Sequence, residues 1–132
     1  MGFEGSSGFH YSDCGFGSFA TTTDVAIPVT QTLQTISIPQ DSVLTIESFV
    51  NCKKTAGTGA GIVGEGNSYI RIIKAQNING VVTIDTLQSL NSEAIVNDVA
   101  FDVSGTDVRL RITGSVNNTF NWSVKTKIKN GV

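Results

Sequence analysis

The chain has 132 residues, enough for one globular domain with an additional arm. Hydrophobic residues make up 39% and charged residues 15% of the chain, which is too apolar and too weakly charged for wholesale disorder. The net charge of −2 gives no reason to expect a nucleic-acid partner or binding to an anionic membrane. The 14 glycines, together with many serines, threonines and asparagines, disfavour long helices, and we predict an all-β fold.

Residues 1–23 form a glycine-rich segment that we predict to be an extended N-terminal arm, separate from a domain at 24–132. The alternative is a flexible tail. The segment lacks the basic region and the continuous apolar stretch of a signal peptide, so we expect synthesis in the cytoplasm without secretion. No apolar run is long enough for a membrane span. The aromatic residues expected to dock into pockets of a partner are Phe3, Phe9, Tyr11, Phe16 and Phe19.

The rest of the chain alternates between apolar and polar residues with a period of two, which is typical of β-strands. The strands we expect cover residues 32–38, 43–54, 69–75, 81–87, 96–103, 107–113 and 119–129. About seven or eight strands in a domain of this size indicate a single antiparallel β-sandwich or jelly roll.

The alternation also predicts which side chains face the core. In the strand at 43–54 the inward face is expected to hold Leu44, Ile46, Ser48, Val50 and Cys52. In the last strand it is expected to hold Phe120, Trp122, Val124, Thr126 and Ile128, with Trp122 as a core anchor. Asn79-Gly80 predicts a tight hairpin, and we expect the strands at 107–113 and 119–129 to form another.

This last hairpin would place five basic side chains on one face: Arg109, Arg111, Lys125, Lys127 and Lys129. They could contact an acidic protein or a nucleic acid, or they could prevent unwanted sheet pairing at an edge. Aromatic side chains do not interleave with them, so stacking on bases is not expected. The first 52 residues contain five acidic and no basic residues, and this asymmetry is consistent with assembly into an oligomer.

A G-x-G-x-x-G pattern at Gly59–Gly64 matches the dinucleotide-binding fingerprint, but that site needs a helix directly after the glycines. The residues that follow read as a turn and a strand, so we expect a loop without a nucleotide.

The sequence contains few candidate residues for catalysis or metal binding. The single histidine, His10, lies in the predicted arm, and with Cys14 and Cys52 it cannot complete a zinc site. Whether the two cysteines pair is left open. Three acidic residues could hold calcium or form a solvated face: Asp98, Asp102 and Asp107. We expect neither an enzyme nor a bound cofactor or metal.

The order of segments resembles that of small β-sandwich proteins from the virions of tailed bacteriophages. The residues concerned are Thr35–Pro39, the strand Ser42–Glu47, the Ile-Arg-Ile-Ile strand after the glycine-rich loop, and Val108–Thr126, in which Asn-Trp opens the final strand. The resemblance implies a capsid-decoration, head-fibre, neck or tail-fibre module, often homotrimeric and without an active site.

We therefore expect a non-enzymatic virion protein that docks its arm onto neighbouring copies of itself and onto other virion proteins. The alternative is a receptor-binding adhesin that recognises a host-surface glycan through the loops at 56–66 and 88–93.

Overall fold

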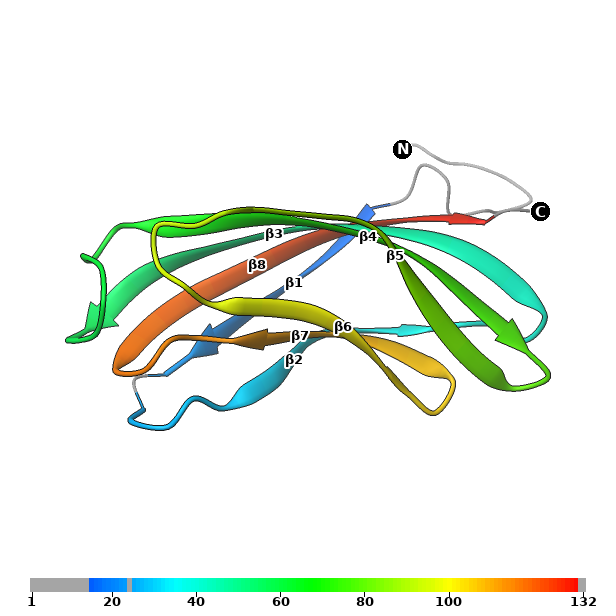
Figure 1. The fold of residues 1–132 in the computed structure, drawn as a ribbon, viewed down its shortest axis with the longest axis horizontal. Helices are drawn as coiled ribbons and strands as arrows, with labels where there is room; N and C mark the ends of the chain where they lie inside the picture. The colour runs from blue at the N-terminus through cyan, green and yellow to red at the C-terminus, as the bar shows by residue number, and fades with distance from the viewer. Residues whose placement is uncertain (1–14, 24, 131–132) are drawn as a thin grey trace.

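The computed structural model describes residues 15–23 and 25–130, which form eight β-strands (Figure 1). The strands are β1 (Gly15–Thr22), β2 (Thr30–Ser37), β3 (Ser42–Gly57), β4 (Gly66–Ile78), β5 (Val81–Ser92), β6 (Asp98–Ser104), β7 (Asp107–Thr113) and β8 (Asn118–Asn130). Helices are absent from this part of the chain. The prediction of an all-β fold is confirmed.

Two antiparallel sheets pack against each other as a β-sandwich (Figure 1). The larger sheet has the strand order β1-β8-β3-β4-β5, and the smaller has the order β2-β7-β6. The prediction of about seven or eight strands in one antiparallel sandwich is therefore confirmed.

The smaller sheet overturns one prediction. Strands β7 and β8 do not form a hairpin, because β7 lies between β2 and β6, whereas β8 lies between β1 and β3 in the other sheet. The chain crosses from one sheet to the other between them. A second difference concerns residues 88–92, which continue strand β5 instead of forming a loop.

Part of the segment expected to be an arm belongs to the larger sheet. Residues 15–22 form β1, which pairs with β8 from Gly15 opposite Lys127 to Thr22 opposite Phe120. Three of the aromatics expected to dock, Phe3, Phe9 and Tyr11, lie outside the described residues, and docking by them stays a prediction.

The core fills the space between the sheets and follows the predicted alternation. All the inward residues expected on β3 and β8 are buried, including Trp122, which is 1% exposed. The indole of Trp122 stacks on Tyr69 with 6.4 Å between ring centroids and lies tilted against Phe120. Its Nε1 donates a hydrogen bond to Thr22 Oγ1 at 2.8 Å.

Two local features shape the strands. Asn79 and Gly80 have φ angles of 52° and 84° and form the two-residue turn between β4 and β5, as predicted. In β2 the register with β7 shifts between Thr32 and Gln34, so Leu33 and Gln34 are both buried. Thr126 Oγ1 donates to the amide oxygen of Gln34, which joins the two sheets inside the core.

The hydrogen bond of the buried indole predicts that Thr22→Val destabilises the protein. Valine fills the space but leaves Trp122 Nε1 without an acceptor, so we expect the free energy of unfolding to fall by about 1–3 kcal/mol. Chemical denaturation followed by tryptophan fluorescence measures this change. In the control, Thr21→Val, an exposed threonine of the same strand loses its bond to Asn121, and a change below about 0.5 kcal/mol is expected. Equal effects in both variants would contradict the argument.

Candidate docking surfaces

One end of the sandwich gathers four of the connections between strands. The loops at residues 25–29, 58–65, 93–97 and 114–117 all lie at this end, on the left in Figure 1. The connections at 38–41, 79–80 and 105–106 lie at the opposite end. Antiparallel pairing imposes this separation, because each strand reverses direction at every connection. We call the first the loop end and the second the hairpin end.

Hydrogen bonds join the loops to one another. Asn117 N donates to Val25 O at 2.9 Å, and Gly59 N donates to Asn117 O at 2.9 Å. Ser115 N donates to the side-chain oxygen of Asn97 at 2.8 Å. The loop at 114–117 is thus bonded to the three others, and the loop end is a connected unit.

Buried Asn67, at the start of β4, fixes the loop at 93–97. Its Oδ1 accepts hydrogen bonds from Ala94 N at 2.8 Å and Ile95 N at 3.1 Å, while its Nδ2 donates to Ile95 O and to the hydroxyl of Tyr69. Tyr69 in turn donates to Glu93 Oε2 at 2.6 Å. Burial and this bond to a carboxylate raise the pKa of Tyr69, so its hydroxyl stays a donor at any physiological pH.

Buried Lys54 fixes the glycine-rich loop. Its side chain continues the inward row of β3, is 2% exposed, and donates from Nζ to the carbonyl oxygens of Gly59 at 3.1 Å and Gly61 at 2.9 Å. The loop leads into β4, not into a helix, which is the arrangement expected from the residues after Gly64. The G-x-G-x-x-G pattern therefore lacks the helix N-terminus that a pyrophosphate needs.

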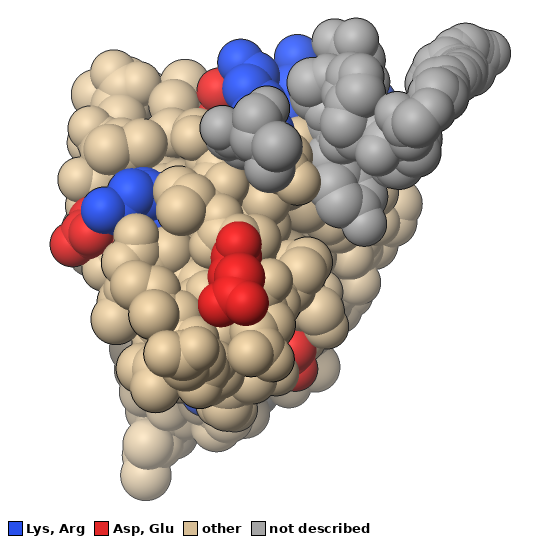
Figure 2. Space-filling view, turned by 90° about the vertical axis from the view of Figure 1, so that its right-hand side faces the viewer, with Lys and Arg blue, Asp and Glu red and all other residues tan. Residues whose placement is uncertain are grey.

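The loops held in this way expose aliphatic side chains. Besides Val29, which adjoins β2, five of these side chains are between 41% and 79% exposed: Ile27, Ile62, Val63, Val96 and Val116. We call these five residues the loop-end surface. All four loops contribute to it, and apolar side chains are enriched in the buried centres of protein contact surfaces. Figure 2 looks onto the hairpin end, where the visible charged side chains are scattered over a largely uncharged surface.

A second surface lies on the outer face of the larger sheet. A hollow of about 400 Å³ opens there across β1, β8 and β3. Its lining residues are Phe16, Gly17, Phe19, Phe49, Asn51, Ser123, Val124 and Lys125. We call it the sheet hollow. It includes two of the aromatics expected to dock, Phe16 and Phe19, and the Phe19 side chain is 86% exposed.

The five basic residues expected on one face are divided between two. Lys125, Lys127 and Lys129 lie on the outer face of the larger sheet, whereas Arg109 and Arg111 lie on the smaller sheet. The prediction of one basic face is wrong because it rested on a β7–β8 hairpin. Lys129 pairs with Glu47 at 3.3 Å.

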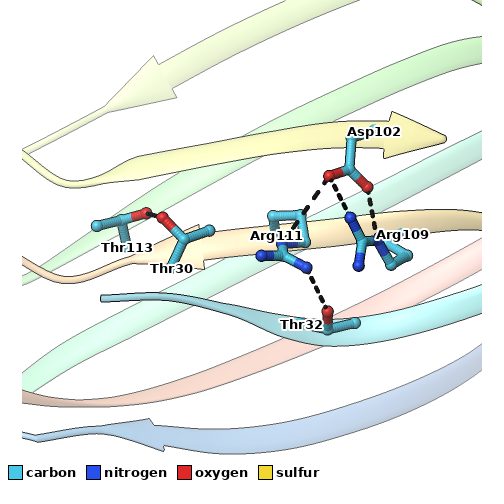
Figure 3. A network of polar contacts seen from close by, with 6 residues as sticks. All are labelled: Thr30, Thr32, Asp102, Arg109, Arg111 and Thr113. Carbon is cyan, nitrogen blue, oxygen red and sulfur yellow. Dashed lines mark hydrogen bonds and ion pairs between the residues drawn. The ribbon is translucent and has the colours of Figure 1, made fainter. Parts of the chain in front are cut away.

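The two arginines belong to a polar network on the smaller sheet (Figure 3). Arg109 donates to both carboxylate oxygens of Asp102, each at 2.8 Å, and Arg111 donates to Thr32 Oγ1 at 3.1 Å. These bonds cross from β6 to β7 and from β7 to β2. The Arg109 guanidinium holds the pKa of Asp102 below its ordinary value. These bonds link β2, β7 and β6. The carboxylate of Asp102 is already paired with the guanidinium of Arg109 on the neighbouring strand.

The described residues offer few groups for catalysis or metal binding. They contain no cluster of three or more His, Cys, Asp or Glu side chains that could hold a metal ion. Cys52 is buried, and burial raises the pKa of its thiol. His10 and Cys14 lie outside the described residues. A helix long and apolar enough to cross a membrane is not found in the described part of the chain.

Comparison with known proteins gives matches at the level of structure. No protein-family model and no curated protein sequence matches the chain. The tailspike protein of Acinetobacter phage vB_ApiP_P1 aligns with a TM-score of 0.50 and 14% identity, over 98% of this chain and 25% of the tailspike. The tailspike of Acinetobacter baumannii phage AM24 gives a TM-score of 0.49 and 11% identity, over 89% and 27% of the two chains.

A third match is the tailspike of Acinetobacter baumannii bacteriophage Fri1, described as a capsular polysaccharide depolymerase, with a TM-score of 0.28 and 14% identity. That alignment covers 86% of this chain and 19% of the tailspike. The chain therefore spans about a quarter or less of the length of these proteins. Such low identities show a likeness of fold alone.

The lowered pKa of Asp102 predicts a pH-dependent contribution to stability. The charged form is stabilised by Arg109, so this contribution is present above the ordinary value of 3.8 and is lost as the pH falls through the lower folded value. We expect Asp102→Asn to lower Tm at pH 6 and the difference from wild type to shrink towards pH 2. Thermal unfolding followed by circular dichroism measures both. A difference that stays constant down to pH 2 would contradict this assignment.

Proposed function

We propose that the chain is a non-enzymatic structural module of a bacteriophage tail protein, which assembles with neighbouring copies of itself and with other virion proteins. The observation that carries this proposal is the loop end, where internal hydrogen bonds hold four loops and five aliphatic side chains face outward. A surface with its backbone already ordered loses little entropy when it binds.

Two further features support assembly as the function. The fold is similar to a region of the tailspike protein of Acinetobacter phage vB_ApiP_P1. The exposed residues of the loop-end surface are aliphatic, which suits burial against another protein. Through this assembly the module would be a component of the virion. Cyclic symmetry, such as that of a trimer, would repeat each contact.

A second candidate function is recognition of a host-surface glycan through the loops. The gathering of four loops at one end favours it, since binding sites commonly lie on loops carried by a rigid scaffold. Binding of the full chain to an array of bacterial surface glycans separates the candidates. Specific glycan binding that is lost on substitution in the loops would favour the adhesin.

The assembly function predicts that charges at the loop end abolish association. In the double variant Ile62→Asp with Val96→Asp, two exposed aliphatic contacts are lost, and each buried aliphatic side chain contributes about 1.5–3 kcal/mol. We expect association to weaken by at least about 100-fold, measured by analytical ultracentrifugation over a range of concentrations.

The matched control replaces exposed aliphatic residues at the hairpin end, in the double variant Ile78→Asp with Val81→Asp. These residues flank the β4–β5 turn, and their substitution should leave association unchanged. Association that is unaffected by the loop-end variant, or reduced equally by both variants, would contradict the proposed function.

A further inference from the structure

The sheet hollow is an unusual feature for the outer face of an antiparallel sheet, which is ordinarily polar. Its position follows from strand register, because Gly17, Lys125 and Phe49 lie side by side on β1, β8 and β3. Gly17 contributes no side chain, while Phe49 and Phe19 provide aromatic walls. The hollow is therefore a depression with aromatic side chains beside polar ones such as Asn51 and Ser123, which an inserted side chain could fill.

Lysines border this depression. Lys125 lines the hollow and Lys127 follows on the same face of β8, and both side chains are exposed. Neither forms an ion pair with the described residues, unlike Lys129, which pairs with Glu47. A ligand that matches this surface combines aromatic rings with nearby carboxylates.

The chain itself contains a segment with this chemistry. Residues 1–14 hold three aromatic residues, two acidic residues and no lysine or arginine. Phe9, Tyr11 and Asp13 are two residues apart, a spacing that puts side chains on one face of an extended strand. The acidic segment and the lysines of β8 are complementary in charge.

The direction of β1 favours the hollow of another copy. The chain enters β1 at Gly15, opposite Lys127, and runs towards the loop end, so the sheet hollow lies ahead of Gly15. A segment that precedes Gly15 in line with the strand leads away from the hollow of its own chain. Fourteen extended residues span about 46–50 Å, which is enough to reach a neighbouring subunit.

We propose that residues 1–14 of one copy bind in the sheet hollow of a neighbouring copy, with aromatic side chains in the depression and carboxylates beside Lys125 and Lys127. This proposal rests on the proposed assembly function and names the partner segment and its binding surface. The exposed phenyl ring of Phe19 would be covered by the bound segment.

Charge exchange between two full-length variants tests the proposal. The first variant reverses the segment, with Glu4→Lys and Asp13→Lys, and the second reverses the surface, with Lys125→Glu and Lys127→Glu. Each variant alone sets like charges against each other, and we expect association at least 10-fold weaker than in wild type. In an equimolar mixture the segment of each variant can bind the oppositely charged surface of the other variant, so association should recover towards the wild-type value.

Controls and outcomes separate this inference from the proposed function. Lys53→Glu alters an exposed lysine of β3 outside the hollow and should leave association unchanged. Circular dichroism and the fluorescence of Trp122 establish that each variant is folded.

Recovery of association in the mixture of the two variants supports docking between copies. Association of either variant that equals wild type, or a mixture of folded variants that stays weak, overturns it. Weak association of the loop-end variant would then leave the proposed function standing, whereas wild-type association of all variants would overturn both.

Discussion

The polar side chains buried at the loop end must find partners in the protein, because water does not reach them. Asn67 and Lys54 meet this requirement with loop backbone or neighbouring side chains. Asn118 meets it in part, since its Nδ2 donates to Ala60 O at 2.9 Å and to Ser115 Oγ at 3.0 Å, whereas its Oδ1 accepts no hydrogen bond from the described residues. The same hydrogen bonds also satisfy backbone N–H and C=O groups of the loops, which therefore depend on these buried side chains. Loops of this length would otherwise be the most mobile part of a sandwich. In this protein the loops are instead held by hydrogen bonds to side chains that are buried in the core.

The two ends of the sandwich consequently differ in what they present. At the hairpin end, turns such as Asn79-Gly80 close neighbouring strands with few residues. At the loop end, three of the four connections cross between the sheets, and all four carry exposed aliphatic side chains. The hairpin end also exposes Ile78 and Val81, but these two flank a single turn. The larger sheet adds a separate depression on its outer face, with aromatic side chains in its lining and lysines at its border. A module with two such surfaces on one rigid framework is suited to repeated contacts in a symmetric assembly.

The sequence could predict the strands and their inward faces, because period-two alternation is a local property that burial between sheets enforces. It could not predict the partners of each strand. The four-residue connection at 114–117 reads as a hairpin loop, yet Asn117, with φ of 58°, helps to carry the chain into the other sheet. The burial of Lys54 and Gln34 could not be predicted from local sequence either. A lysine or glutamine is ordinarily expected to be exposed to solvent. The position of Lys54, two residues after Cys52 on the inward row of β3, was the available signal for its burial. Strand β1 was missed because its glycines lower strand propensity, and its pairing with β8 depends on residues 100 positions away.

Amide hydrogen exchange by NMR tests most directly whether the loop end is a fixed surface. The amides of Gly59, Ala94, Ser115 and Asn117 all donate hydrogen bonds within the loop end. We predict that they exchange slowly, with protection similar to that of the core strands, because opening any one loop breaks bonds to its neighbours. Exchange of these four amides at the rates of an unstructured peptide, in a protein whose β3 and β8 amides are protected, would contradict the account.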